Sequence, residues 1–329
     1  MLIPPKYTLT AKISQYLSSI ESSKAVIDSI SIPAEVEMNI RRSSTLKSSL
    51  YSARIEGNQL TEADLESPSK TQSKIEIFNI LKALNFINKT AGRDITIKDI
   101  ADIHKLVMDK LSPEAGVFRT EPSAIYNAAG IAIYLPPPPR YIQSNLTKFI
   151  DYIKNPKERF TPILAVLGHY IFEKIHPFID CNGRVGRILL QKILIQGGYG
   201  MKGVINFEQN LDNNRSGYYR SLEEPEKEAT NYVEFMLEIL SEASLATKEL
   251  LLSKKEPNPE DFLMPRRAEI YNIIKDHSLV NFDQIRRRFM AVNERTLRFD
   301  LKRLQDGGFI IKLGTTKGVY YKPAKSPYN

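Results

Sequence analysis

The sequence predicts a mainly α-helical protein with two short β-hairpins. Apolar residues recur every three or four positions along most of the 329 residues, which is the spacing of helices that bury one face. Alternating and β-branched residues gather at 123–135 and 309–322, each around a glycine-containing turn. The charged segment 253–260 contains two prolines and has the composition of a linker.

Each expected helix has its own apolar pattern and end signals. The first covers 8–30, and the second opens near Pro33 and stops near Gly57, because proline favours helix starts and glycine favours helix ends. His104 lies on an amphipathic helix and is expected to be structural. Further helices are expected at 72–90, 97–111, 141–154, 162–174, 188–195 and 228–252, with one around Tyr218 and Tyr219 and three beyond the linker.

The composition is that of a water-soluble globular protein. Apolar residues make up 42% and charged residues 26% of the chain, and no apolar run approaches the length of a membrane span. Residues 1–10 lack a signal-peptide core, and a single cysteine excludes an internal disulfide framework, so a cytoplasmic protein is expected. The sequence has no P-loop, and its four histidines and one cysteine show no zinc spacing.

The net charge of +8 is unevenly divided along the chain. From residue 261 onward there are 14 Lys and Arg against 7 Asp and Glu, which leaves about +1 for the first 260 residues. Such an asymmetry indicates a separate C-terminal domain.

Chemistry-bearing residues are concentrated between His176 and Arg187, in the order His-Pro-Phe-Ile-Asp-Cys-Asn-Gly-Arg-Val-Gly-Arg. The stretch lies between two apolar helices, which form a rigid mount for a reactive loop. Pro177 ends the first helix and is expected to hold His176 in extended geometry. Asn182 and Gly183 open a new helix, whose free N–H groups form an anion site.

Three charged side chains border this anion site. Arg184 and Arg187 are three positions apart on one helical face, where both guanidinium groups suit phosphate oxygens. Asp180 beside them suits a divalent cation that bridges two phosphates. The stretch therefore predicts a polyphosphate site with His176 as a nearby base.

The same stretch resembles the signature of the Fic family, His-Pro-Phe-x-Asp/Glu-Gly-Asn-Gly-Arg-x-x-Arg, and departs from it at Cys181, where the family has glycine. The resemblance implies a Fic-type helical bundle that moves AMP from ATP to a Ser, Thr or Tyr hydroxyl of a protein target. His176 would deprotonate that hydroxyl, and Asp180 would hold Mg²⁺. The phosphates would be bound around Asn182, Gly183 and Arg184, with the γ-phosphate on Arg187.

A second motif lies at the end of the helix that stops near Gly57. Ser52 and Glu56 are four residues apart and share one helical face. Together with Gly57 they resemble the family's inhibitory motif, Ser/Thr-x-x-x-Glu-Gly/Asn. The resemblance implies that Glu56 pairs with Arg187 and withholds it from the γ-phosphate.

Two other segments gain an interpretation from the resemblance. The 123–135 hairpin corresponds to the family's flap, whose edge holds a target segment by main-chain pairing. Tyr218 and Tyr219 correspond to a tyrosine pair that lines the adenosine pocket. Without the resemblance, the hairpin is a surface loop, and the tyrosines are one packed and one exposed side chain.

The C-terminal pattern of three helices and a glycine-tipped hairpin resembles a winged helix-turn-helix. The exposed face of its third helix would present Arg295, Arg298 and Lys302 to DNA or other phosphates. The expected domains are an N-terminal helical region with the inhibitory helix at 1–70, a catalytic core at 71–252, a linker at 253–262 and the winged helix at 263–329.

Two classes of function are compatible with these patterns. One is an adenylyltransferase autoinhibited by Glu56, acting on a target protein or on itself, with another nucleotide, a phosphocholine donor or the removal of AMP as variants. The other is a DNA-binding regulator whose Fic-like core senses nucleotide. No membrane partner is expected, and a homodimer is compatible with either function.

Overall fold

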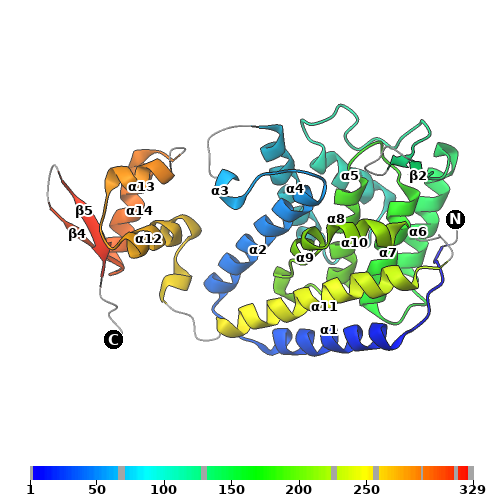
Figure 1. The fold of residues 1–329 in the computed structure, drawn as a ribbon, viewed down its shortest axis with the longest axis horizontal. Helices are drawn as coiled ribbons and strands as arrows, with labels where there is room; N and C mark the ends of the chain where they lie inside the picture. Colours follow the sequence, from blue (N-terminus) through cyan, green and yellow to red (C-terminus); the bar gives the residue numbers. More distant parts are fainter. Residues whose placement is uncertain are drawn as a thin grey trace. The chain divides into compact units, whose positions relative to one another are not determined.

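The computed structural model describes residues 3–65, 71–126, 132–223, 228–254, 259–289, 292–314 and 318–324, and here the fold is mainly helical, as predicted (Figure 1). The chain divides into two compact units. The larger contains Met1–Ser31, Arg41–Leu60 and Thr71–Leu252, and the smaller contains Ile32–Ile40, Thr61–Lys70 and Ser253–Asn329. Residues 127–131 and 315–317, within the two predicted hairpins, and residues 255–258, within the predicted linker, lie outside the described residues.

The predicted helices occur close to their expected ranges. Differences are confined to ends and to short helices, whose apolar pattern is too brief to show a period. Helix α2 begins one residue after Pro33 and ends before Gly57, whose φ of 102° suits a helix stop. The helices are α1 Ala11–Ser29, α2 Ala34–Ile55, α4 Gln72–Lys89, α5 Ile97–Val107, α6 Ile142–Lys154, α7 Thr161–Ile175, α8 Asn182–Gln196, α9 Phe207–Asn213, α10 Arg215–Leu222 and α11 Thr230–Ser253, with 3₁₀ turns at Pro139–Tyr141 and Met201–Gly203.

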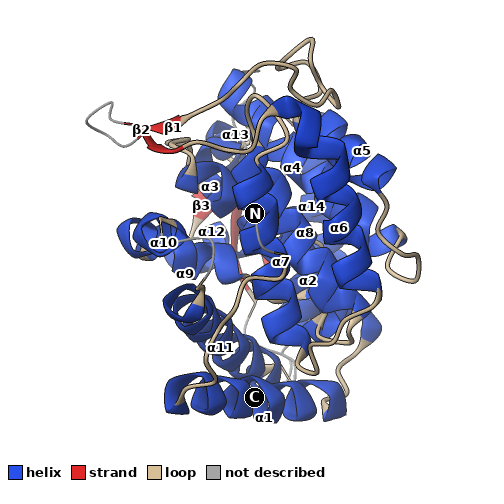
Figure 2. Cartoon of the chain, turned by 90° about the vertical axis from the view of Figure 1, so that its right-hand side faces the viewer, coloured by secondary structure: helices blue, strands red, loops and turns tan. Residues whose placement is uncertain are grey.

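Helix α7 is the centre of the larger unit, because all its residues from Pro162 to Ile175 are buried. A helix buried on every side needs neighbours all around. Helices α6 and α8 pack on it, and α4 and α5 pack on α8. Helices α1 and α11 lie side by side (Figures 1 and 2), and Ser241 Oγ donates to Ser19 Oγ at 2.8 Å between them. The short segment that joins α7 to α8 is therefore anchored at both ends in the core.

A small hairpin projects from the larger unit (Figure 2). Its strands are β1 Ile125–Tyr126 and β2 Ala132–Tyr134, which pair antiparallel with a register irregularity between Ile125 and Tyr126. Both strands fall within the predicted range 123–135. Among the described residues, no helix has the length and apolar character that crossing a membrane requires.

The smaller unit has its own apolar core and a three-stranded antiparallel sheet in the order β3-β5-β4. Strand β3 was not predicted, because a strand of two residues is too short to show an alternation of apolar and polar residues. Asp300 is 1% exposed and forms ion pairs with Arg266 and Arg267. The winged-helix interpretation stays a prediction. The elements are α3 Glu62–Leu65, a 3₁₀ turn Pro259–Phe262, α12 Pro265–His277, β3 Val280–Asn281, α13 Phe282–Arg288, α14 Glu294–Asp306, β4 Ile310–Leu313 and β5 Tyr320–Pro323.

Candidate active site

His176 ends α7 at the wall of a cavity. Its backbone is left-handed, with φ 48° and ψ 60°, so the extended geometry predicted from Pro177 is wrong. The His176 N–H still donates to Phe172 O, and the chain then reverses as it does at many left-handed helix ends. Burial lowers the pKa of His176 to about 4. The imidazole is therefore neutral at pH 7 and able to accept a proton.

Arg119, which sequence reasoning did not select, holds this unusual backbone in place. Its Nε donates to His176 O at 2.8 Å, and its terminal nitrogens donate to Glu121 O at 3.1 Å and Pro137 O at 2.6 Å. Its own N–H donates to Pro177 O at 3.0 Å. The residue is 3% exposed. It thus ties the loop after α7 to the segments on both sides of the hairpin, a role that no sequence spacing reveals.

The loop between α7 and α8 is closed by the side chain of Asn182. Its Oδ1 accepts from Phe178 N at 3.0 Å, and its Nδ2 donates to Phe178 O at 2.9 Å. The side chain of Asn182 is therefore occupied within the loop, and only its backbone at the start of α8 is placed to meet a ligand. Helix α8 begins at this residue, as the Asn-Gly pair predicts.

His104 supports the same loop from α5. Its ring stacks on Phe178 with centroids 3.7 Å apart. Its Nδ1 accepts from Gly116 N–H at 2.8 Å, so Nε2 carries the proton and donates to Asp180 O at 3.3 Å. Burial lowers the pKa of His104 to about 4. These contacts agree with the structural role expected of this histidine.

The two arginines of the predicted phosphate site take different partners. Arg184 forms ion pairs with Glu76 of α4 and with Asp180, whose Oδ1 lies 3.1 Å from Arg184 Nη2. Glu76 also accepts from Asn58 Nδ2 at 2.8 Å. Sequence reasoning missed Glu76, because a glutamate on an amphipathic helix looks the same whether or not it meets an arginine 108 residues later.

Arg187 instead forms hydrogen bonds with residues of the Ser52–Gly57 motif. It is fully buried and donates to Ser52 Oγ at 3.0 Å, to Ser52 O at 2.8 Å and to Glu56 Oε1 at 2.9 Å. Although burial lowers the pKa of Arg187, Glu56 raises it above its ordinary value. A Cβ at Gly183 would lie 2.5 Å from Glu56 Oε1, so glycine is what allows this carboxylate to reach the first turn of α8.

A cavity of about 180 Å³ is lined by His176, Glu56 and Gly183, among others. Tyr218 is 1% exposed, with its hydroxyl 3.2 Å from His169 Nε2. Tyr219 is 37% exposed and donates to Ile55 O at 3.1 Å. The pair is thus one packed and one exposed side chain, as expected. The cavity is lined by Glu56, Ile125, Ile133, Tyr134, Glu173, Lys174, His176, Gly183, Tyr218, Tyr219, Leu222 and Glu223.

The ionisable residues Glu173, Lys174 and Glu223 of this lining were not predicted. Burial raises the pKa of Glu173 to about 8, and its Oε1 has no hydrogen-bond partner among the described residues. The Lys174 ammonium lies 4.4 Å from the centre of the Tyr134 ring, which connects α7 to the hairpin. Helix α7 is buried on all sides, so no polar stripe marks Glu173 and Lys174 in the sequence.

The residues here fit a magnesium ion that is bound partly by a substrate. Among the described residues, no group of three or more His, Cys, Asp or Glu is arranged to hold a metal. Asp180 presents a 65% exposed carboxylate next to the start of α8. Mg²⁺ is often bound by one or two carboxylates, with phosphate and water as its other ligands. The donor set suits that mode and does not suit an all-protein cage.

Cys181 precedes α8 in a left-handed conformation, with φ 65° and ψ 13°. Glycine adopts this backbone without strain, whereas a side chain costs ~1–2 kcal/mol. The side chain is buried, with Sγ 2.9 Å from Met108 Sδ. Burial raises the pKa of its thiol to about 12, so Cys181 is a packing group and not a nucleophile.

Cys181→Gly is expected to be more stable than Cys181→Ala by about 1 kcal/mol. Both variants lose the thiol, but only alanine keeps a Cβ at positive φ. The reference pair is wild type and Gly92→Ala, because Gly92 lies outside the positive-φ region and a Cβ there would meet nothing within 4 Å. Alanine should be at least as stable as glycine at position 92. Urea unfolding measures each free energy, and an alanine variant at 181 as stable as the glycine variant would refute the strain.

Part of this chain matches known proteins in sequence. Residues 94–194 match the model of the Fic/DOC family. The protein adenylyltransferase Fic of Nematostella vectensis is 32% identical over 143 residues, which are 42% of this chain and 32% of the relative. That of Drosophila melanogaster is 33% identical over 129 residues, which are 38% of this chain and 25% of the relative. The match thus spans a third or less of the length of these relatives.

Solved structures extend the likeness to the fold. The crystal structure of a Fic family protein from Desulfovibrio desulfuricans G20 has a TM-score of 0.67 at 21% identity and covers 99% of both chains. A Fic domain containing signaling protein from Bacteroides thetaiotaomicron has a TM-score of 0.60 at 20% identity and covers 75% of this chain. Residues 94–194 therefore match the Fic/DOC family, and the fold of the chain is similar to that of these solved structures.

Proposed function

We propose that this protein is an adenylyltransferase that moves AMP from ATP to a hydroxyl group of a protein target. The observation that carries the proposal is a single cavity lined both by His176, which burial keeps neutral, and by the first turn of α8 at Gly183. A base and an anion-binding helix start in one cavity are what transfer of a phosphoryl-type group to a hydroxyl requires. The names of the relatives support the same activity.

In the proposed reaction, His176 accepts the proton of the target hydroxyl as its oxygen attacks the α-phosphorus of ATP. The bond from that phosphorus to the oxygen bridging to the β-phosphate breaks, and pyrophosphate leaves. N–H groups of Asn182 and Gly183, with Arg184, stabilise the phosphate charge. Mg²⁺ held by Asp180 would neutralise charge on the leaving group. Tyr218 and Tyr219 would line the adenosine pocket, and the hairpin edge would hold the target backbone.

His176→Ala is expected to abolish AMP transfer and to leave ATP binding largely intact. In this proposal the imidazole contacts the attacking hydroxyl and not the phosphates, and losing a general base slows a reaction by roughly 10²–10⁴-fold. Transfer is measured with α-labelled ATP and Mg²⁺, and binding is measured by calorimetry with a non-hydrolysable ATP analogue. Transfer at the wild-type rate in the variant would rule out His176 as the base.

The Ser52–Glu56 segment is proposed to inhibit this reaction. Glu56 occupies one nitrogen of Arg187 and lies against Gly183, where an ATP phosphate would have to sit. A carboxylate and a phosphate cannot both occupy the same guanidinium edge. Nη1 of Arg187 is buried and has no hydrogen-bond partner among the described residues, so it is suited to a γ-phosphate once Glu56 withdraws.

Glu56→Gly is expected to raise AMP transfer by roughly ten- to a thousandfold, since each 1.4 kcal/mol of preference for the inhibited form is about tenfold in the competent population. Initial rates of self-labelling or target labelling are compared for wild type, Glu56→Gly and Glu56→Gly/Arg187→Ala. The double variant should lose most of the gain, because Arg187 is the group that Glu56 withholds. An unchanged rate in Glu56→Gly would disprove the inhibitory role.

A DNA-binding regulator is a second candidate, which the charge on α14 favours. Arg295, Arg298 and Lys302 are all exposed on this helix. Arg298 is partly engaged, because its guanidinium lies 4.0 Å from the centre of the Phe282 ring and 3.5 Å from Glu294. Arg295 and Lys302 are therefore the preferred phosphate contacts in this proposal.

For this candidate, we expect the full chain to bind duplex DNA weakly and with steep salt dependence. Arg295→Ala/Lys302→Ala should weaken binding and reduce the slope of log affinity against log salt by about 2, one for each lost phosphate contact. Lys12→Ala/Lys98→Ala removes the same charge from exposed lysines of the larger unit and serves as the control. Equal losses in both double variants, in a fluorescence anisotropy titration, would exclude α14 as the DNA contact.

Other activities of the same site stay alternatives, namely another nucleotide donor, a phosphocholine donor, or the removal of AMP from a modified protein. Parallel incubations with each labelled donor, and with AMP-modified protein, distinguish them. A cytoplasmic location, modification of itself and a homodimer are part of the same proposal.

A further inference from the structure

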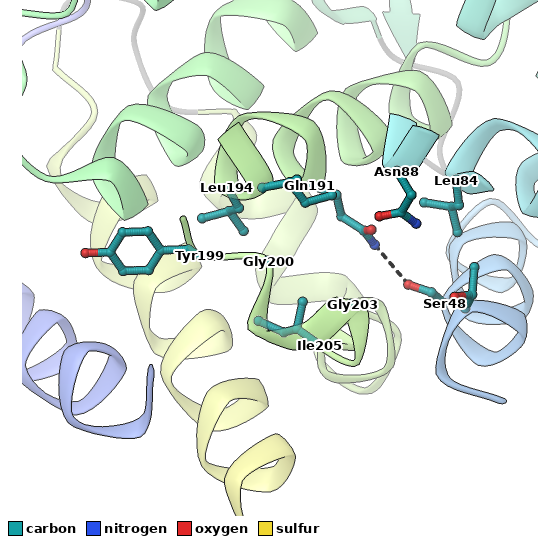
Figure 3. A pocket seen from close by; sticks show the side chains of 11 residues that line it. Ser48, Leu84, Asn88, Gln191, Leu194, Tyr199, Gly200, Gly203 and Ile205 are labelled. Carbon is teal, nitrogen blue, oxygen red and sulfur yellow. Dashed lines mark hydrogen bonds between the residues drawn. The ribbon is translucent and has the colours of Figure 1, made fainter. Parts of the chain in front are cut away.

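A second buried polar cluster lies on the same pair of helices as the Ser52–Arg187 contact. It consists of Ser48 in α2, Gln191 in α8 and Glu208 in α9, here called the Glu208 cluster. Gln191 Nε2 donates to Ser48 Oγ at 3.0 Å (Figure 3) and to Glu208 Oε1 at 2.7 Å, and Ser48 Oγ donates to Glu208 Oε2. The three side chains thus form a closed ring of hydrogen bonds.

The ring is deeply buried. Ser48 is 2% exposed and Glu208 is 1% exposed. Burial raises the pKa of Glu208 to about 7, against the opposing effects of Ser48, Gln191 and Arg187. A buried carboxyl group that loses one of its donors is left with an unsatisfied oxygen, which is costly in a low-dielectric interior. The ring therefore resists separation of α2 from α8 and α9.

The register of the two helices links this ring to the inhibitory contact. Ser48 lies four residues before Ser52 on α2, and Gln191 lies four residues after Arg187 on α8. Residues four apart in a helix lie one above the other on the same face. The Ser48–Gln191 and Ser52–Arg187 contacts are therefore successive connections between the same two helix faces.

Helices α9 and α10 add two contacts near the end of α2. Arg54 Nε lies 3.2 Å from Asp212 Oδ2, and the Tyr219 hydroxyl donates to Ile55 O at 3.1 Å. Glu56 follows directly after the last residue of α2 and is 27% exposed in its side chain. Its position thus depends on a helix that is held mainly by residues other than Glu56.

We propose that the Glu208 cluster is a latch that sets the position of α2 and thereby keeps Glu56 engaged on Arg187. This inference rests on the proposed inhibition by Glu56. In the latch, Glu208 is a positioning residue that acts through Ser48 and the α2 backbone and makes no contact with a substrate. Opening the latch releases Glu56 without any change to Glu56 or Arg187.

Ser48→Ala is the sharpest test, because it removes two bonds of the ring and only one oxygen atom. A cavity of about 20 Å³ lined by Ser48 and Gln191 adjoins the ring, room for roughly one water, so the remaining polar groups can be hydrated and the variant is expected to fold. Ser49→Ala is the matched control. Ser49 is also fully buried in α2, but its hydroxyl donates to Leu46 O of its own helix.

Two measurements are made on wild type, Ser48→Ala and Ser49→Ala. The first is amide hydrogen exchange in residues 48–56 without ATP, which does not depend on any transfer activity. The second is the rate of labelling from α-labelled ATP, with and without Glu56→Gly. We expect Ser48→Ala to increase both exchange and labelling by roughly three- to tenfold, the scale of one lost buried hydrogen-bonding group. In the Glu56→Gly background, Ser48→Ala should add nothing.

Each contrary result has a definite meaning. Equal exchange in Ser48→Ala and Ser49→Ala would overturn the latch, whatever the labelling rates. Faster exchange in Ser48→Ala with labelling at the wild-type rate, while Glu56→Gly is fast, would overturn the link from latch to Glu56. An equal rise with and without Glu56 would also overturn it, because the effect would then bypass Glu56. A failure of the proposed inhibition itself is seen separately, as an unchanged labelling rate in Glu56→Gly alone.

Discussion

The larger unit depends on one buried positive charge, the guanidinium of Arg187. A fully buried arginine is tolerated only if hydrogen-bonding groups and a negative charge surround it. Here these partners are Ser52 and Glu56, which lie 135 and 131 residues earlier in the chain. Because α8 is packed against the central helix α7, Arg187 cannot move out to solvent. Helix α2, which carries Ser52, therefore packs against α8, and this contact joins α2 to the region that matches the Fic/DOC family.

Burial also determines the charges around the cavity. His104, His169 and His176 are held neutral, with pKa values lowered to about 4, 3 and 4. Their contribution to stability is fully present above pH 6.5 and is lost as the pH falls through these values. The contribution of Glu173 to stability depends on pH in the opposite direction. Because its pKa is raised to about 8, this contribution is present below pH 4.5 and is lost as the pH rises through 8. The three histidines and Glu173 are thus mainly uncharged at pH 7.

Much of this arrangement could be predicted from local sequence. The helices followed from apolar periodicity, and the start of α8 followed from Asn182-Gly183, because both signals act within a few residues. The meeting of Glu56 with Arg187 was expected from the resemblance to the family's inhibitory motif. The conformation of His176 was predicted wrongly, since the preference imposed by Pro177 is weaker than the contacts that Arg119 makes from 57 residues away.

What the sequence by itself determined is therefore the set of helices, the reactive loop between two of them, and the identity of the groups that the loop carries. Only the tertiary structure decided which of these groups meet. Arg184 pairs with Glu76, and the Asn182 side chain bonds to Phe178 within its own loop. Glu208 forms hydrogen bonds with Ser48 and Gln191. The physical reason is that a buried polar group must find a partner wherever packing leaves one, and packing is a property of the whole fold, which no short stretch of residues encodes.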